Sequence, residues 1–426
     1  MDLLLVGSGG REHALLKALL KSREVNKIYC LPGNAAMEGS RVKCVPIQPK
    51  QVTEIADFAA FHQVDFAVVA PDDPLALGAV NELEGVGVPA FGPDQDAARI
   101  ESSKIFAKQL MKKYHIPTAA FRVFDRARDA LSYVKTCPIP IVVKADGLAL
   151  GKGVTVASTR EEAVRAVKEL MEKHKFGDAG SRIVIEECLS GPEVSVLCFT
   201  DGKTIKPMVS SMDHKRALDG DQGLNTGGMG VVAPNPFYTE EIAKTCMETI
   251  FLPTIRAMAQ EGCPFKGCLY FGLMLTKDGP KVIEYNSRFG DPETQAVLPL
   301  LDGELLPILM ACRNGTLETC EVKFKNQAAC CVVQASKGYP QAYETGFAIT
   351  LPKDGDFVRY DAAGVKKAEG GKGLVTGGGR VASVTAIADT LEEAVKLAYA
   401  HVDDIAFENA YHRTDIGQRA LKGELE

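Results

Sequence analysis

The sequence lacks several features that would assign it to a particular class of protein. Its 12 cysteines are scattered and never form a C-x-x-C pair, which argues against a zinc site and favours reduced, buried thiols. No apolar run approaches the roughly 20 residues that a membrane-spanning helix requires. The N-terminus has neither the basic start nor the small-residue cleavage site of a signal peptide. We therefore expect a cytoplasmic protein without a membrane partner.

An excess of positive charge is also missing. The 49 Lys and Arg residues are outnumbered by 55 Asp and Glu residues, which gives a formal net charge of -6. This balance argues against a nucleic-acid partner. The hydrophobic content of 46% and the charged content of 24% are typical of globular domains. The chain is long enough for about two to four such domains.

The most informative stretch is residues 281–295, KVIEYNSRFGDPETQ. Its apolar start predicts a strand, and side chains alternate along a strand, so Glu284, Asn286 and Arg288 should project from one face. Two oxygen ligands beside a guanidinium suit a Mg2+ ion that also holds substrate phosphates. The alternative is a half-buried strand with a solvated polar face.

The chain begins with a predicted strand at residues 2–6, a glycine-rich turn and a helix that should reach Leu20. Backbone N–H groups and the helix dipole converge at such a turn, which predicts a phosphate site with Arg11 as a partner. A dinucleotide-binding fingerprint is disfavoured because Glu12 replaces its third glycine and the next strand ends without an acid. The alternative is a turn that only permits close packing.

Two further charged positions lie where ligands often bind. Asp72 and Asp73 follow a predicted strand at residues 66–70, so they should face the ligand crevice of an open α/β sheet or else begin a helix. Lys104 lies in the first turn of a predicted helix, where a cation is mildly unfavourable. Its position indicates either a ligand role or a surface lysine.

Residues 139–156 predict two strands joined by a flexible loop. Lys144 ends the first, apolar strand, where burial requires a negative partner. Gly151, Lys152 and Gly153 offer N–H groups and an ammonium that can fold over phosphates, although the Walker A pattern is not matched. The alternative is a plain hairpin with a lysine at its tip.

A predicted strand at residues 182–189 runs into a hinge whose backbone groups can pair with an adenine edge. Glu186, Glu187 and Glu193 are candidates for binding an amine or ribose hydroxyls, and the alternative is surface charge. Residues 211–231 are so polar and glycine-rich that they predict a loop that binds something.

That predicted loop carries both signs of charge between Asp213 and Arg216. The character of the chain changes near residue 326, where short strands and one helix predict a separate α+β module. Residues 377–380 predict a hairpin turn within it, and residues 411–417 either line a cleft or dock as a tail.

Several stretches together carry a resemblance to a known family. They are VGSGGREHA at 6–14, PGNA at 32–35, KADGL at 144–148, GKGV at 151–154, FGDAG at 176–180, DHKR at 213–216, NTGGMG at 225–230, RFGDPET at 288–294 and DIG at 415–417. On these stretches the chain resembles the phosphoribosylamine–glycine ligase family of the ATP-grasp superfamily, over nearly its whole length. NTGGMG and RFGDPET are specific to this family, whereas the other stretches indicate only the superfamily.

The resemblance implies a mixed α/β and α+β multidomain fold. It implies an N-terminal open parallel α/β substrate domain at 1–100, an ATP-grasp domain at 101–325 with a mobile lid at about 118–190, and a small C-terminal α+β domain at 326–426. It further implies a monomer that joins glycine to 5-phosphoribosylamine in purine biosynthesis, with ATP consumed through glycyl phosphate.

Site residues also follow from the resemblance. It implies that ATP contacts Lys104, Lys144, Gly151, Lys152, Gly153, Glu186, Glu187, Leu189 and Glu193. It implies Mg2+ or Mn2+ at Glu284 and Asn286, and catalytic roles for Arg288, Lys215 and Asp213. It implies substrate contacts at Gly9, Gly10, Arg11, Asp72, Asn225, Thr226, Gly227, Asp291 and Thr294.

The implied chemistry requires no dedicated nucleophile, and the chain has no convincing Ser/His/Asp arrangement. Transfer of the γ-phosphoryl group converts a carboxylate into an electrophile and needs mainly positioning and charge neutralisation. The chain departs from the family pattern at Asp72, Leu150, Leu224 and Ser287, where Glu, Ala, Pro and Cys are usual. The shorter Asp72 leaves open a contact to the amine. The alternatives are another ATP-grasp ligase and a nucleotide-binding module without turnover.

Overall fold

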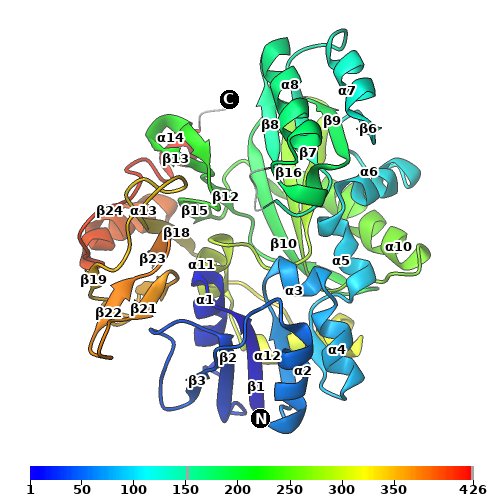
Figure 1. Ribbon diagram of the computed structural model, residues 1–426. Coiled ribbons are helices and arrows are strands. Elements are labelled where there is room, and N and C mark those ends of the chain that lie inside the picture. Colours follow the sequence, from blue (N-terminus) through cyan, green and yellow to red (C-terminus); the bar gives the residue numbers. More distant parts are fainter. Residues whose placement is uncertain (150–152, 424–426) are drawn as a thin grey trace.

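A computed structural model describes residues 1–149 and 153–423 of the chain (Figure 1). The N-terminal part forms a parallel sheet in the order β3-β2-β1-β4-β5. Its strands are β1 (Asp2–Gly7), β2 (Lys27–Pro32), β3 (Val42–Cys44), β4 (Phe66–Val69) and β5 (Ala90–Phe91). The core residues of β1 are buried on both faces, as the continuous apolar run of this strand requires. The open parallel α/β sheet predicted from the sequence is confirmed.

Short helices cover this sheet. They are α1 (Gly10–Leu19), α2 (Val52–Phe61), α3 (Asp72–Ala76), α4 (Ala79–Gly85) and α5 (Gln95–Ser102). The strand order changes direction between β1 and β4, and such a switch point opens a crevice beyond the carboxyl ends of the strands. The turn before α1 and the start of α3 both lie at this edge.

A second sheet, in the order β6-β9-β7-β8, lies at the top of Figure 1. It consists of β6 (Phe121–Phe124), β7 (Ile141–Ala145), β8 (Val154–Ala157) and β9 (Ile183–Glu187), and it packs against α7 (Ala127–Val134) and α8 (Arg160–Val167). The two strands predicted within residues 139–156 are present as β7 and β8, and they pair antiparallel with Lys144 opposite Val154. This unit has its own hydrophobic core.

A third, antiparallel sheet has the order β11-β10-β16-β17. It contains β10 (Glu193–Asp201), β11 (Ile205–Pro207), β16 (Lys266–Thr276) and β17 (Gly279–Asn286), and α6 (Lys104–Lys113), α9 (Glu240–Cys246) and α10 (Leu252–Gln260) share a core with it. Both hairpins predicted in this part are present. The pairing slips in β17, because Gly272 pairs with Glu284 and Leu273 pairs with Val282, which leaves Ile283 as a bulge.

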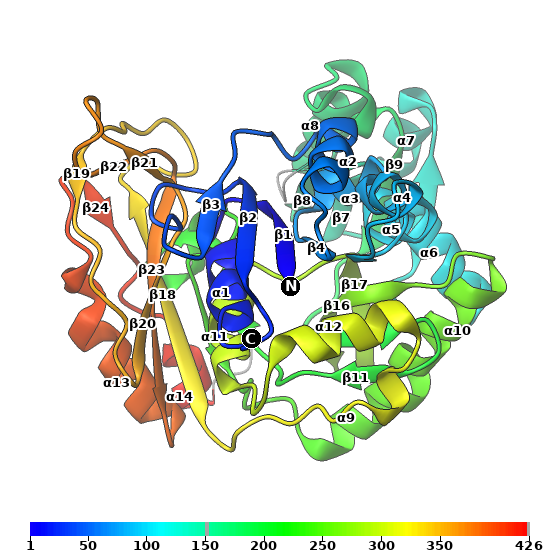
Figure 2. The ribbon, with the colours of Figure 1, turned by 90° about the horizontal axis from the view of Figure 1, so that it is seen from below.

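The largest sheet joins two distant parts of the chain. Its order is β12-β15-β18-β23-β20, with β24 pairing on β18. The members are β12 (Met212–Asp213), β15 (Gly230–Ala233), β18 (Ala328–Ser336), β20 (Val358–Ala362), β23 (Arg380–Ala388) and β24 (Ala410–Tyr411), with α13 (Leu391–His401) packed on them. Figure 2 shows β1 and α1 between this sheet and strands β16 and β17. The C-terminal strands therefore continue a sheet that begins with β12 and β15.

A small sheet and three further α-helices lie outside these four sheets. They are β19 (Ala348–Ile349), β21 (Val365–Lys367) and β22 (Leu374–Thr376) in a small sheet, and the helices α11 (Glu293–Val297), α12 (Leu305–Asn314) and α14 (Gln418–Lys422). No helix within residues 1–149 and 153–423 is long and apolar enough to cross a membrane.

Two sequence predictions were wrong. Residues 211–231 are not a single loop, because β13 (Arg216–Leu218) and β14 (Gln222–Asn225) pair within them. Residues 377–380 are not a hairpin turn, since β22 and β23 belong to different sheets. Glycines mark a change of chain direction but do not decide whether the flanking strands pair with each other.

Candidate functional site

A cavity of about 850 Å3 lies where these sheets meet. Most of the predicted site residues line it: Arg11, Asp72, Lys104, Lys144, Gly153, Glu186, Glu187, Leu189, Glu193, Asp213, Lys215, Asn225, Thr226, Gly227, Glu284, Asn286, Arg288 and Asp291. Gly9, Gly10 and Thr294 are not among the described residues that line it. Gly151 and Lys152, together with the departure at Leu150, lie outside the described residues.

Three lysines gather at the end of the cavity below the β7–β8 hairpin. Lys144 donates to Oε2 of Glu186 at 3.2 Å, and Lys108 lies 2.9 Å from the same oxygen. Lys144 donates in addition to the carbonyl of Ile283 at 2.9 Å, a group that the bulge in β17 leaves free. The prediction that Lys144 needs a negative partner is confirmed, and Glu186 is that partner.

Sequence reasoning missed Lys108, although it follows Lys104 by one helical turn on α6. Burial lowers the pKa of Lys108 to about 8, and burial also lowers the pKa of Lys104. Lys104 donates to the carbonyl of Gly147 at 3.2 Å, and Ser103 caps α6. Two lysines one turn apart that both line a cavity indicate an anionic ligand.

Strand β17 presents Glu284 and Asn286 to the cavity, as alternation predicted. Lys215 lies 3.4 Å from Glu284 and 3.2 Å from Glu193. The charge of Lys215 is the main reason why the pKa of Glu284 is lowered to about 2. Glu284 is therefore ionised at neutral pH and ready to accept a cation.

The oxygen pair fits a divalent metal ion. An ionised carboxylate and an amide oxygen are hard ligands, of the kind that Mg2+ accepts together with substrate phosphates. No group of three or more His, Cys, Asp or Glu side chains in the described part of the chain forms a metal cage. A metal ion held here would therefore take most of its ligands from phosphate oxygens and water.

Arg288 follows the oxygen pair and is largely buried, with 19% of its side chain exposed. Its Nη2 lies 3.1 Å from Glu101 and 4.0 Å from Asp72. Its Nε atom is buried and has no hydrogen-bond partner among residues 1–149 and 153–423. Such an unpartnered donor beside a cavity points to a ligand that accepts it.

Two carboxylates at the other end of the cavity carry no matching cation. The buried Oδ1 of Asp213 has no hydrogen-bond partner, and no ion pair joins Asp213 or Glu293 to a cation within the described ranges. Glu293 accepts the Tyr270 hydroxyl at 3.1 Å. Burial raises the pKa of both carboxyl groups, and each lies in the field of the other. Sequence reasoning placed Glu293 at this turn without a role and missed Tyr270.

The C-terminal part of the chain adds Arg380, which sequence reasoning treated as part of a turn. Its Nη2 pairs with Asp291 at 3.0 Å, and its Nη1 donates to the carbonyl of Gly227 at 2.8 Å. The amide of Gly227 donates to the Tyr339 hydroxyl at 3.2 Å. No local pattern marks Arg380, because its partners lie far away in the sequence.

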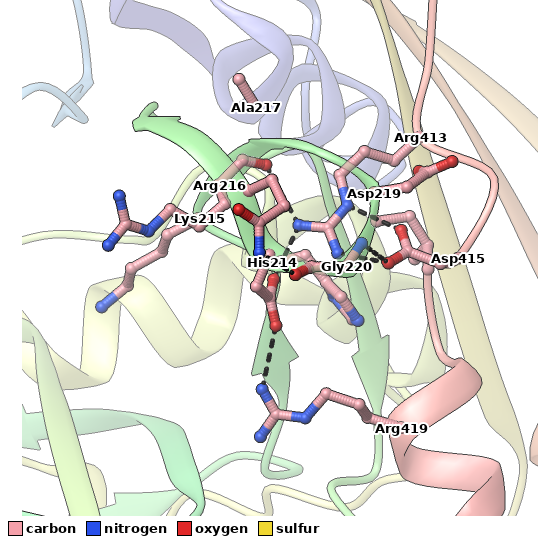
Figure 3. A network of polar contacts seen from close by, with 12 residues as sticks. His214, Lys215, Arg216, Ala217, Asp219, Gly220, Arg413, Asp415 and Arg419 are labelled. Carbon is pink, nitrogen blue, oxygen red and sulfur yellow. Dashed lines mark hydrogen bonds and ion pairs between the residues drawn. The ribbon is translucent and has the colours of Figure 1, made fainter. Parts of the chain in front are cut away.

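Residues 411–417 dock as a tail against the β13–β14 hairpin, one of the two predicted outcomes (Figure 3). Arg413 is buried and donates to the Arg216 carbonyl at 3.1 Å and to Asp221 at 2.9 Å. Asp415 receives both ends of the Arg413 guanidinium at 2.7 Å. The side chains of Lys215 and Arg216 extend away from the tail in Figure 3, and both line the cavity.

The glycine turn before α1 is more closed than the sequence suggested. The amide of Gly9 donates to Glu12 at 2.6 Å, and a methyl group on Gly10 would lie 2.5 Å from Gln295. Arg11 lies 2.6 Å from Glu12 and lines the cavity. The Thr294 hydroxyl, in turn, donates to the carbonyl of Gly290, in the turn before α11, at 2.6 Å.

Glu187 and Leu189 flank the hinge after β9. One oxygen of Glu187 accepts the Ala120 amide at 2.9 Å, and Lys281 lies 3.8 Å away. Leu189 and Cys188 line the cavity beside it. This end therefore combines an apolar wall with a polar rim.

Comparison with known proteins matches these features to one family along almost the entire chain. Family models for phosphoribosylglycinamide synthetase match as its N domain at residues 1–101, its ATP-grasp (A) domain at 102–294 and its C domain at 329–419. The phosphoribosylamine–glycine ligase of Rhizobium meliloti is 45% identical over 425 residues, which cover 100% of each chain. That of Caldanaerobacter subterraneus is 44% identical over 416 residues, covering 98% of this chain and 99% of the relative.

Solved structures agree. The phosphoribosylamine–glycine ligase of Thermotoga maritima superposes with a TM-score of 0.85 at 32% identity, covering 98% of this chain and 100% of that one. The biotin carboxylase domain of a Hydrogenobacter thermophilus 2-oxoglutarate carboxylase, solved with MgADP, shares the fold with a TM-score of 0.75 at 14% identity, covering 96% and 91%. The resemblance seen in the sequence is confirmed, and the chain belongs to the phosphoribosylamine–glycine ligase family, with its ATP-grasp fold.

Proposed function

We propose that this chain joins glycine to 5-phospho-D-ribosylamine at the expense of ATP, giving glycinamide ribonucleotide, ADP and phosphate in de novo purine biosynthesis. Family membership supports the reaction. One observation in the site carries it further: a lysine cluster and an oxygen pair share a cavity with two carboxylates that lack a cation. Such a cavity is built for a polyphosphate at one end and an amino group at the other.

The chemistry requires activation of a carboxylate. The glycine carboxylate attacks the γ-phosphorus, the bond from that phosphorus to ADP breaks, and glycyl phosphate forms. The amine nitrogen of phosphoribosylamine then attacks the carbonyl carbon, and phosphate leaves as the amide forms. Both steps depend on alignment and on neutralisation of charge, and the side chains around the cavity are suited to both.

We assign ATP to the lysine end. Lys104 and Lys144 would contact phosphates, and the other members of this assignment are Gly151, Lys152, Gly153, Glu186, Glu187, Leu189 and Glu193. Glu284 and Asn286 would hold Mg2+ or Mn2+, which when bound draws charge from the phosphate oxygens. Closure of the β7–β8 hairpin over the nucleotide would exclude water from the acyl phosphate.

The two amino substrates fit the other end. The carboxylates of Asp213 and Glu293 would bind the glycine ammonium. Lys215 forms ion pairs with Glu284 and Glu193 next to this position. Arg288 would face the transferring phosphoryl group. Arg11, Asp72, Asn225, Thr226, Gly227 and Asp291 would surround the ribosylamine. Gly9, Gly10 and Thr294 would act by shaping the backbone around Arg11 and Asp291.

The proposal extends to the organisation of the protein. We propose domain limits at 1–100, 101–325 and 326–426, with a lid at about 118–190, and a monomeric cytoplasmic protein whose partners are small molecules. Sedimentation of the full chain would check the monomer.

ADP release tests the proposed reaction. With Mg-ATP and glycine, release should require phosphoribosylamine generated in the cuvette. Release with another acid in place of glycine would indicate a different ATP-grasp ligase. No release under any condition would indicate a nucleotide-binding module.

A further inference from the structure

A buried carboxylate connects the N-terminal part of the chain to Arg288. Glu101 lies near the end of α5 and is only 7% exposed. Its Oε2 accepts the backbone amide of Ser287 at 2.7 Å and the Ser287 hydroxyl at 2.8 Å. Its Oε1 pairs with Nη2 of Arg288 at 3.1 Å. All three donors come from the turn after β17, so Glu101 binds this turn as a unit.

The other groups around Arg288 hold it less firmly. Asp72 is 4.0 Å away, and the Asn286 amide oxygen accepts at 3.4 Å. The Phe289 carbonyl, on the neighbouring residue, accepts Nη1 at 3.2 Å. Of the carboxylates paired with Arg288 in the described ranges, Glu101 is therefore the nearer, and it is the more deeply buried.

The orientation of Arg288 matters because one of its donors is unused. Nε has no partner, while Nη1 and Nη2 are both engaged on the protein side. A guanidinium is planar, so fixing its two terminal nitrogens also fixes the direction of the Nε–H bond. A fixed donor near developing charge avoids the cost of reorganisation during the reaction.

We propose that Glu101 is a positioning residue, which with Ser287 holds the guanidinium of Arg288 in the orientation that serves phosphoryl transfer. The inference rests on the proposed function, since it concerns the phosphoryl group that Arg288 would face. Glu101 does not act as an acid or base here, because donors from Ser287 and Arg288 occupy both of its oxygens. Its influence on catalysis passes through Arg288.

A double-mutant cycle tests this dependence. Glu101→Gln removes the charge at nearly constant volume, and we expect kcat to fall about 10- to 100-fold with the KM for ATP changed less than about 2-fold. Arg288→Met should lower kcat about 100- to 1000-fold. The double variant should be no slower than Arg288→Met alone. Independent, multiplying losses, or a Glu101→Gln variant with unchanged kcat, would overturn the inference.

Two further variants separate positioning from stability. Ser287→Ala keeps the bond from the Ser287 backbone amide to Glu101 and the pair between Glu101 and Arg288, so kcat should fall only about 2- to 5-fold. This variant provides a second test of the positioning role if Glu101→Gln does not fold. Asp361→Asn is a matched control, since Asp361 is a buried carboxylate paired with Lys17 outside the cavity. It should leave kcat within about 2-fold. An equal loss of kcat in Asp361→Asn would overturn a specific role for Glu101.

A crystal structure of Glu101→Gln distinguishes this inference from the proposed function, because it needs no turnover. The Arg288 guanidinium should rotate or occupy two conformations. An unchanged guanidinium would overturn the positioning role whether or not the chain is a ligase. An inactive wild-type chain with a displaced Arg288 in the variant would overturn only the proposed reaction.

Discussion

The two ends of the cavity differ in the sign of the charge that the protein leaves uncompensated. At one end, Lys108 and Lys144 share the carboxylate of Glu186, and Lys104 donates to the carbonyl of Gly147 without an ion pair in the described part of the chain. At the other end, Asp213 and Glu293 have no cation in the described part of the chain. A buried charge without a partner is unfavourable, so each end of the cavity should bind a ligand group of the opposite charge.

The middle of the cavity behaves differently from both ends. Lys215 is paired with Glu193 and Glu284, and Arg288 is paired with Glu101. Compensated charges keep their geometry in the absence of a ligand. The comparison teaches that paired groups define the shape of the site, whereas unpaired groups define which ligand charges it accepts.

The largest effect should come from the boundary between these regions. Glu284→Ala removes the ionised oxygen that would hold the metal and leaves Lys215 with one partner, so kcat/KM should fall about 1000-fold. The rate of ADP release at increasing Mg2+ concentration measures this loss of kcat/KM. Asp278→Asn, at the tip of the same β16–β17 hairpin, is the control and should retain activity. A loss that high Mg2+ fully restores would assign Glu284 to affinity alone.

Asp213→Asn should sharpen the contrast between the ends. Without the carboxylate, the glycine ammonium loses a charged partner, and the KM for glycine should rise about 10- to 100-fold while the KM for ATP stays constant. Steady-state kinetics with glycine and ATP varied in turn give the two KM values separately. Asp219→Asn, on the nearby hairpin, should change neither KM. A rise in the KM for ATP alone would reverse our assignment of the two ends.

Lys144→Met tests the opposite end. It leaves Glu186 paired with Lys108, so the fold should survive, while the KM for ATP rises about 10-fold and the KM for glycine stays constant. Isothermal titration with ATP gives the same quantity without turnover. Unchanged ATP affinity would mean that Lys144 only balances Glu186.

The smallest effect is a pH dependence confined to the lysine end. Burial lowers the pKa of Lys108 to about 8, so its positive charge is lost as pH rises through about 8. ATP affinity should therefore fall about 3- to 10-fold between pH 7 and 9, and Lys108→Met should flatten this slope. The free energy of unfolding should instead rise with pH between about 8 and the ordinary lysine pKa of 10.5. In that range Lys108 is deprotonated in the folded chain but still protonated in the unfolded chain. A slope unchanged in Lys108→Met would assign it to another group.

The predictions from the residues that the structure confirms rest on local sequence patterns. Alternation along one strand placed Glu284 and Asn286 in the cavity, and an apolar strand ending in lysine required the partner found at Glu186. These inferences needed only neighbours in the sequence. The open parallel sheet, in contrast, was implied by the resemblance to the family, and the structure confirms it.

Residues that act through distant contacts escaped prediction. Glu101 binds Ser287, which lies 186 positions away, and Arg380 of the C-terminal part contacts Gly227 and Asp291. No periodicity marks such residues, because their partners are set by packing between sheets. The closed turn at Gly9 was missed for another reason: Glu12 counted against a dinucleotide site, but its capping bond to Gly9 was not considered.

Strand β15 has a consequence for how the protein can be divided. It pairs with β12 on one side and with β18 on the other, and all four of its residues are buried. A fragment that ended at residue 325 would leave the β18 side of this strand open as a free edge of hydrogen-bonding groups. Such a fragment should self-associate when expressed alone and should become soluble when the piece from 326 onward is co-expressed. The C-terminal region thus supplies four of the six strands of a sheet that β12 and β15 begin.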